Sequence, residues 1–409
     1  MPEKSHTARA EPRARVVMGI SLAALGAAAF ASVAIGALAP DLKLAFGFSR
    51  TEIGIVSALV MLGASIASRP MGRLTDRLGP WKVLVLALGG VALGASVEAA
   101  APSGWVLMAG TLLLGLAYGA VGPPTNVAVA GRMQTGIGFF MSVKQAGMPL
   151  GSFLAGLVLP SVASWLSWRW AFGLTGLVAL AVAAFSGPLR HTGSIDRAAS
   201  TAGAGPDARP GSRPGIGRDE APPRRTWIAL GTFGFLMAGG QWCFLAYLVL
   251  YLTDARGFSH TAAGVALALA TACSVGGRLL WGWVSDRPGW RARSLLLASL
   301  LATVGCGLLA ADLPSALIWP AAALTGAALI GWNGAFLGVI ADRAARGTVG
   351  HASGTVMTIV FAGAVAIPPL FGYISQVSNH WELLWGLTAI FAALAGIALK
   401  LFLPPDPPR

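Results

Sequence analysis

The stretch GRLTDRLGPWK at residues 72–82 decides the fold of this chain, because it recurs as GWVSDRPGWR at residues 282–291. Both copies read G-x-x-x-D-R-x-G followed by a basic residue, and each stands between two long apolar runs. The glycines permit a tight turn between antiparallel helices, and the aspartate can cap a neighbouring helix or pair with an arginine. One copy could be an ordinary helix hairpin, whereas two copies in matching loops indicate an internal repeat.

Twelve apolar runs surround these two loops. A helix needs about 20 apolar residues to cross a bilayer, because its backbone must satisfy its hydrogen bonds internally. The predicted spans are 16–38, 52–70, 82–101, 105–129, 137–160, 169–188, 227–252, 262–284, 294–311, 315–341, 353–375 and 382–403. The repeated stretch falls in the second loop of each set of six.

The composition supports a membrane protein. Of the 409 residues, 55% are hydrophobic and only 11% are charged. A soluble chain of this length carries about twice that charged fraction to cover its surface. The sequence therefore predicts an all-α membrane protein with twelve transmembrane helices in two pseudo-symmetric six-helix bundles.

The segment at 189–225 differs from the rest of the chain, because it is rich in Gly, Pro, Ala and Arg and nearly free of large apolar residues. Such a composition cannot bury enough surface to fold, so we expect a disordered linker. The expected organisation is an N-terminal tail at 1–15, a six-helix bundle at 16–188, the linker at 189–225, a second bundle at 226–403 and a C-terminal tail at 404–409.

The net charge of +13 indicates orientation rather than nucleic-acid binding, since the basic residues lie between apolar runs. With the N-terminus in the cytoplasm, 23 of the 29 Lys and Arg residues fall on the cytoplasmic side. Four fall outside (Lys43, Arg50, Arg169 and Arg256). This asymmetry follows the positive-inside rule. We therefore expect a monomer in a bacterial cytoplasmic membrane, with both termini in the cytoplasm.

The repeated loop and the six-plus-six organisation resemble the major facilitator superfamily over nearly the whole chain. The resemblance implies two bundles around a central cavity that opens alternately to each side of the membrane. It also implies that the loop residues act in gating at the cytoplasmic side: Gly72, Asp76, Arg77, Gly79, Gly282, Asp286, Arg287 and Gly289.

Two cations, Lys144 in the fifth span and Arg278 in the eighth, lie at membrane depth. Charges there are expensive, so each is a candidate site residue that we expect to face the central cavity. All sixteen Asp and Glu residues fall in tails, loops or helix ends, so a carboxylate partner is lacking at mid-depth. Cations without a partner favour an anionic ligand, and Arg can bind a carboxylate with two hydrogen bonds. The predicted substrate is a small organic anion.

The arginine in G-R-x-x-x-G-x-x-S-D-R resembles the monocarboxylate and oxalate:formate branch of the superfamily, in which a basic residue at this place binds the substrate carboxylate. That resemblance assigns the role to Arg278. The chain departs from the branch at Ser274, where monocarboxylate carriers have an aspartate, and at 353–375, which lacks the lysine of the oxalate exchanger. Lys144 is the pseudo-symmetric candidate for that missing lysine.

Polar and aromatic residues at mid-depth complete the candidate cavity, where rings and amides can surround an organic anion. They are Tyr118, Asn126, Gln145, Gln241, Trp242, Tyr247, Trp332 and Asn333.

The alternative within transport is export of a drug or amphipathic metabolite. Drug antiporters carry an arginine in the fourth helix, but Thr111 stands at that position, although Gly115 and Pro123 fit the frame. Import, proton symport and anion exchange remain open. No catalytic constellation, metal cluster or cofactor motif is visible, so we do not expect an enzyme.

Overall fold

The computed structural model describes residues 7–130, 143–186, 223–285, 287, 289–311, 313–343 and 349–403. Twelve helices within these ranges are long and apolar enough to cross a membrane, which confirms the predicted count. The expected linker at 189–225 and the tail at 404–409 lie outside the described residues, apart from 223–225. The N-terminal tail is described from Thr7, where the first helix begins.

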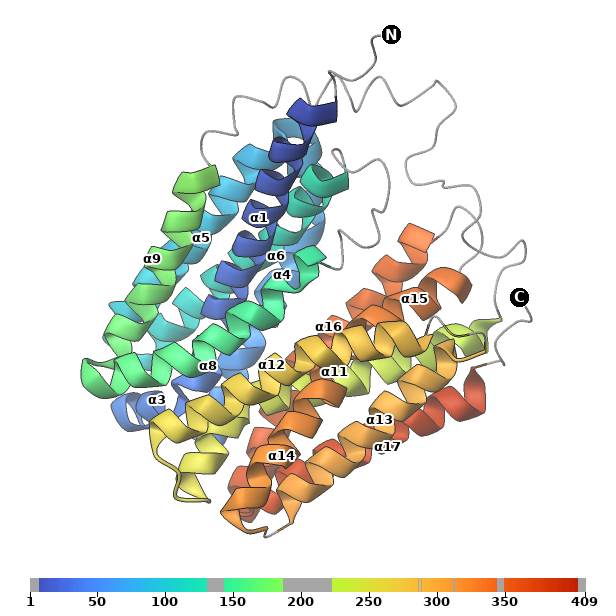
Figure 1. Ribbon diagram of the computed structural model, residues 1–409. Helices are drawn as coiled ribbons and strands as arrows, with labels where there is room; N and C mark the ends of the chain where they lie inside the picture. The colour runs from blue at the N-terminus through green and yellow to red at the C-terminus, as the bar shows by residue number, and fades with distance from the viewer. Residues whose placement is uncertain are drawn as a thin grey trace.

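The first half of the chain forms one bundle (Figure 1). Its helices are α1 (Thr7–Ser32), α2 (Ala34–Ala37), α3 (Ala39–Phe46), α4 (Arg50–Leu78), α5 (Pro80–Ala99), α6 (Gly104–Ala130), α8 (Gly147–Trp165) and α9 (Trp168–Ser186). The fifth predicted span was placed at 137–160, but the apolar helix runs over Val143–Trp165, because Pro160 continues the helix instead of ending it. Residues 137–142 lie outside the described part of the chain.

The second half forms the other bundle (Figure 1). Its helices are α11 (Arg224–Asp254), α12 (His260–Ser285), α13 (Arg291–Ala310), α14 (Ser315–Thr325), α15 (Asn333–Arg343), α16 (Val349–Ser378) and α17 (Trp381–Phe402). The tenth predicted span is not one regular helix, because a π-helical turn, η2 (Gly326–Ile330), separates α14 from α15. Such turns often mark functional sites. This one lies against α12, where a Cβ on Gly326 would overlap the carbonyl oxygen of Ala270.

Both copies of the repeated loop make the tight turn that the glycines predict. Gly79 ends α4 with a φ of 87°, and Gly289 has a φ of 71°. These are left-handed conformations that other residues rarely adopt. At its other end α4 starts with a capping box, since Ser49 Oγ accepts from the Glu52 N–H and Glu52 Oε2 accepts from the Ser49 N–H.

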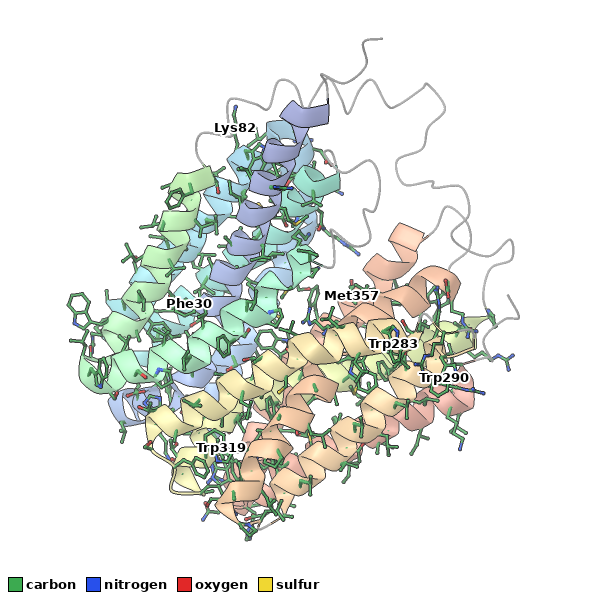
Figure 2. All side chains as sticks on the ribbon, viewed as in Figure 1. Phe30, Lys82, Trp283, Trp290, Trp319 and Met357 are labelled. Atoms are coloured by element: carbon green, nitrogen blue, oxygen red, sulfur yellow. The ribbon has the colours of Figure 1, made fainter. Side chains whose placement is uncertain are left out.

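The surface of the bundles is apolar and carries tryptophans near the helix ends. Trp105, Trp165 and Trp170 are exposed at the ends of α6, α8 and α9 that lie farthest from Thr7. On the second half, Trp283 and Trp290 lie near the opposite end from Trp319 (Figure 2). Tryptophan at both levels of an apolar surface is typical of proteins that span a bilayer.

The two bundles lean together at one end. We call the end where α1 and α11 begin the terminal end, and the opposite one the distal end (Figure 1). The contacts between the halves join α4 to α16, α8 to α12, and α2 and α3 to α11. At the distal end, Arg50 Nη1 donates to the Ser375 carbonyl oxygen over 2.7 Å. Lys43 forms an ion pair with Asp254 there as well.

Candidate functional site

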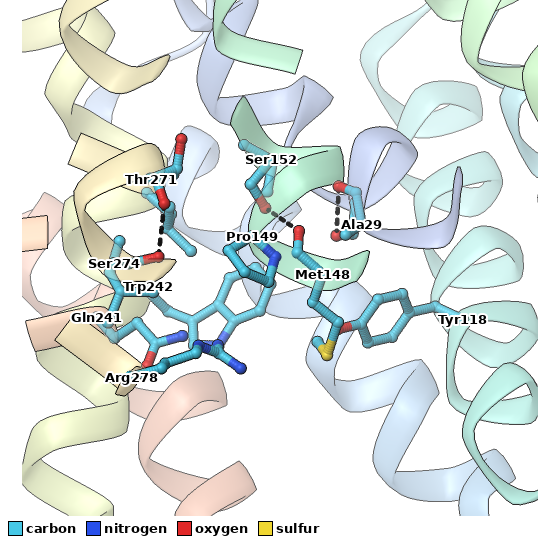
Figure 3. A pocket seen from close by; sticks show the side chains of 14 residues that line it. Ala29, Tyr118, Met148, Pro149, Ser152, Gln241, Trp242, Thr271, Ser274 and Arg278 are labelled. Carbon is cyan, nitrogen blue, oxygen red and sulfur yellow. Dashed lines mark hydrogen bonds between the residues drawn. The ribbon is translucent and has the colours of Figure 1, made fainter. Parts of the chain in front are cut away.

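A cavity of about 40 Å³ lies between the halves, in the middle of the spanning helices. Its lining comes from α1, α6 and α8 of the first half and from α11, α12 and η2 of the second (Figure 3). The lining residues are Ala29, Ser32, Val33, Tyr118, Met148, Pro149, Ser152, Gln241, Trp242, Leu245, Thr271, Ser274, Arg278 and Ile330. None of these residues is acidic, and Arg278 is the cation among them.

Arg278 reaches the cavity from α12 (Figure 3). Its Nε atom is buried and has no hydrogen-bond partner among the described residues. A buried N–H without a partner is costly, and the cost is larger on a charged group. The guanidinium therefore has donor capacity available for a ligand in the cavity.

Ser274 lies one turn before Arg278 on the same wall. Its hydroxyl donates to the Thr271 carbonyl oxygen over 2.6 Å (Figure 3). The position that carries an aspartate in monocarboxylate carriers thus holds a small neutral group here, and its only proton is already donated. Ser274 therefore supplies no negative charge to compensate Arg278.

Aromatic rings line the cavity from both halves. Tyr118 of α6 and Trp242 of α11 approach it from opposite sides, and both are half-buried (Figure 3). Flat rings of this kind can pack against the apolar body of a ligand while the polar atoms contact its charged end.

Gln241 is held by two residues behind the cavity wall. Its Oε1 accepts from Trp332 Nε1 over 3.2 Å and from Asn333 Nδ2 over 3.3 Å. Both partners come just after the π-helical turn and its C-cap Gly331, so this part of the chain places them against α11. With its oxygen occupied, Gln241 has its NH₂ group left to offer to a ligand. Trp332 is fully buried, and like Asn333 it supports the cavity wall instead of lining it.

Lys144 lies outside the lining of this cavity. It is 1% exposed, and its Nζ donates to Asn126 Oδ1 and lies 3.5 Å from Thr125 Oγ1. Residues 99–195 contain no Asp or Glu, so an acidic partner from this half is distant in sequence. Asn126 nevertheless lies on α6, the helix that carries Tyr118 to the cavity. Lys144 lies just before α8, the helix that carries Met148 to it. The neighbouring Gln145 has a buried Oε1 with no partner among the described residues.

Tyr247 belongs to the distal contact and not to the cavity lining. Its hydroxyl lies 2.9 Å from the Arg50 carbonyl oxygen and 2.8 Å from that of Pro368. The side chain is fully buried where α11 meets α4 and α16.

The described loop residues of the repeat lie at the terminal end. Asp76 and Arg77 are exposed at the end of α4. In the second copy the guanidinium of Arg287 stacks over the Trp283 ring at 3.8 Å from its centroid. A Cβ at Gly72 or Gly282 would meet no atom within 4 Å, so packing does not require glycine there. Asp286 lies outside the described residues.

The cavity also contains residues that the sequence did not single out. Ser32, Ser152 and Thr271 bring hydroxyls to it, and Ile330 enters from the π-helical turn. Hydroxyl residues are common in membrane helices, where they bond to their own backbone as Ser152 does to Met148, so composition alone does not distinguish them.

Known proteins resemble this chain over most of its length. The gentisate transporter of Corynebacterium glutamicum is 25% identical over 386 residues, covering 90% of this chain and 84% of that protein. The probable nitrate/nitrite transporter NarK2 of Mycobacterium tuberculosis is 30% identical over 348 residues, 82% of each chain. Human monocarboxylate transporter 11 is 26% identical over 398 residues, 90% of this chain and 79% of that protein.

Solved structures share the fold. A bacterial homologue of the human lysosomal transporter Spinster, crystallised in an inward-facing and occupied conformation, superposes with a TM-score of 0.75 at 15% identity, covering 95% of this chain and 96% of that one. The sequence profile of the Major Facilitator Superfamily matches residues 20–368. The resemblance deduced from the repeated loop is therefore confirmed, and the chain belongs to the Major Facilitator Superfamily of secondary transporters, which are not enzymes.

Proposed function

We propose that this transporter moves a small organic anion, a monocarboxylate, and that Arg278 binds the carboxylate. The observation that carries the proposal is the buried Arg278 Nε without a hydrogen-bond partner, in a cavity between the halves whose lining is not acidic. In a low-dielectric site, an anion supplies the charge that the lining lacks. A guanidinium also matches the two oxygens of a carboxylate.

An aromatic body suits the rest of the lining. Tyr118 and Trp242 offer ring faces, and Gln241 with the nearby hydroxyls can bond to ring substituents. Two of the relatives support this class, since they are named as a gentisate transporter and as monocarboxylate transporter 11. The present volume of about 40 Å³ has room for a few water molecules only, so a ring-sized substrate requires the halves to part around it.

A small inorganic anion is the second candidate. The narrow cavity favours it, and the relative NarK2 is named as a probable nitrate/nitrite transporter. The same arginine would serve a planar oxyanion with the same two-point geometry.

Orientation and gating complete the proposal. Placing both termini in the cytoplasm puts 23 of 29 Lys and Arg residues on the cytoplasmic side, and the distal end then faces outward. The state described here is closed at that outer end by contacts such as Tyr247 with Arg50. The terminal-end residues Asp76, Arg77, Asp286 and Arg287 would latch the halves when the outer end opens, as the superfamily resemblance implies.

Uptake into proteoliposomes tests the proposal, with aromatic and aliphatic monocarboxylates, nitrate and a lipophilic cation as substrates. Losing a charged hydrogen bond costs about 1.5–3 kcal/mol, or roughly 10- to 100-fold in affinity. Arg278→Lys should therefore weaken carboxylate uptake, and Arg278→Ala should abolish it. Arg169→Ala is the matched control, because it removes a cation that bonds the Ala101 carbonyl away from the cavity. Uptake that survives in Arg278→Ala overturns the assignment of the carboxylate site to Arg278. Transport of nitrate alone selects the inorganic anion as substrate. Transport of the lipophilic cation alone favours export of a drug or amphipathic metabolite.

A further inference from the structure

His260 of the second half contacts two residues of the first half at the distal end. It is the first residue of α12, and its Nε2 lies 2.8 Å from the carbonyl oxygen of Ala37 in α2. Its Nδ1 lies 3.2 Å from Oδ2 of Asp41 in α3. The two side chains are largely buried, at 16% and 22% exposed. The imidazole thus lies between two oxygen atoms that both belong to the opposite bundle.

The chemistry of those oxygens determines how many protons the contact holds. A carbonyl oxygen can only accept, so Nε2 must carry a hydrogen. In a neutral imidazole, Nδ1 would then present a lone pair to the Asp41 carboxylate, and the two would repel. One further proton, on Nδ1 or on the carboxyl group, replaces this repulsion with attraction.

We propose that His260 and Asp41 form a proton-binding site between the two halves, which is complete only while the distal end is closed. When the halves part there, each group returns to water and the shared proton loses its second partner. This proton site is separate from the site proposed for the anion, and the proposal requires only that the distal end opens and closes.

Several of the other charges at this end have partners of their own. Lys43 pairs with Asp254, Arg50 stacks over the Trp381 ring, and Arg256 bonds the Leu313 carbonyl oxygen. The described residues of α8, α2 and α14, which pack near the start of α12, include no charged side chain. Burial raises the pKa of the Asp41 carboxyl above its ordinary value, and the nearby His260 partly opposes that rise. The geometry and the burial both favour a bound proton.

The consequence is a link between external pH and the state of the carrier. Because the closed distal end binds one proton more than the open end, acid favours closure. One linked proton changes the ratio of closed to open molecules by at most about tenfold per pH unit. With the distal end facing outward, an acidic exterior would favour the state described here.

Distance measurements across the distal end test this link. Nitroxide labels on Leu44→Cys in α3 and Leu317→Cys in α14 report its opening, because both leucines are exposed and lie on opposite halves. Cys243, Cys273 and Cys306 are first replaced by alanine. Pulsed electron resonance between pH 5.5 and 8.5 then gives the closed fraction, and we expect it to rise as the pH falls.

Three variants distinguish the site from other titrating groups. His260→Gln keeps a donor for Ala37 but cannot take up a proton, and Asp41→Asn removes the carboxylate. Both should lose most of the pH dependence. His380→Gln is the matched control, because His380 lies 3.5 Å from Glu382 of the same half and both are exposed. It should behave as the unmodified protein does. The proposal is overturned if the closed fraction of the unmodified protein does not change with pH. It is also overturned if the closed fraction changes with pH as strongly in His260→Gln and Asp41→Asn as in the unmodified protein.

Discussion

The hydroxyl of Tyr247, in the second half, lies 2.9 Å from the carbonyl oxygen of Arg50, in the first half. The carbonyl oxygen of Pro368 lies 2.8 Å from the same hydroxyl, so one proton is shared between two acceptors from opposite bundles. A buried hydrogen bond of this kind contributes about 1 kcal/mol, and only while the distal end is closed. Opening the carrier at this end therefore requires the bond to break.

Tyr247→Phe should shift the carrier toward the state that is open at the distal end. The loss of about 1 kcal/mol corresponds to a roughly fivefold fall in the ratio of closed to open molecules. The spin-label distance between the α3 and α14 sites measures the shift. Tyr251→Phe is the control, since its hydroxyl bonds the Leu309 carbonyl within one half. It should lower the melting temperature without changing the distance, and equal shifts in both variants would contradict the assignment.

Part of this arrangement was predictable from the sequence and part was not. The twelve spans were predictable because each needs an apolar run that a soluble protein rarely contains. Arg278 stood out because a charge in such a run is costly. The direction in which a side chain points is harder to predict from sequence. A helix that is apolar all round has no polar face to indicate how it is rotated about its axis. For that reason Tyr247 was expected in the cavity and lies at the distal contact. Lys144 was expected to face the central cavity, but it lies outside the cavity lining and is bonded to Asn126.

Long-range and irregular features were beyond sequence reasoning altogether. The contact of His260 with Asp41 joins residues 219 positions apart, and each lies at a helix end where polar residues are ordinary. The π-helical turn at Gly326–Ile330 depends on how closely α12 approaches, which composition does not reveal.

Gly36→Ala should interfere with closure of the distal end. A Cβ at Gly36 would overlap the carbonyl oxygen of Leu245 in the other half, and backbone cannot move aside cheaply. Overpacking of this kind typically costs about 1–3 kcal/mol. We expect the ratio of closed to open molecules to fall roughly fivefold or more. Gly19→Ala in the preceding helix α1 is the control, because a Cβ at Gly19 would meet no atom within 4 Å. A closed fraction unchanged in Gly36→Ala would contradict the contact.

Lys144→Met should separate stability from transport. Lys144 is a buried cation whose described partners, Asn126 and Thr125, are neutral, so its desolvation is poorly compensated. Methionine of similar length removes that cost, and the melting temperature should stay the same or rise. We expect anion uptake to fall at least tenfold, since an expensive charge at membrane depth is usually retained for function. Uptake at the unmodified rate would limit Lys144 to a structural role.

Asp41→Asn tests the electrostatics of the distal end through protein stability. Burial raises the pKa of this carboxyl in the folded protein, whereas in the unfolded chain it titrates near its ordinary value of about 4. The carboxyl therefore stabilises the fold most at acid pH, and that contribution is lost as the pH rises through the raised pKa. Asparagine has nearly the same shape and does not ionise. The difference in melting temperature between Asp41→Asn and the unmodified protein should be smallest at pH 4 and become more positive toward pH 8, as differential scanning fluorimetry in detergent can measure. A difference that becomes negative with rising pH would mean that attraction between the carboxylate and His260 outweighs the cost of burial.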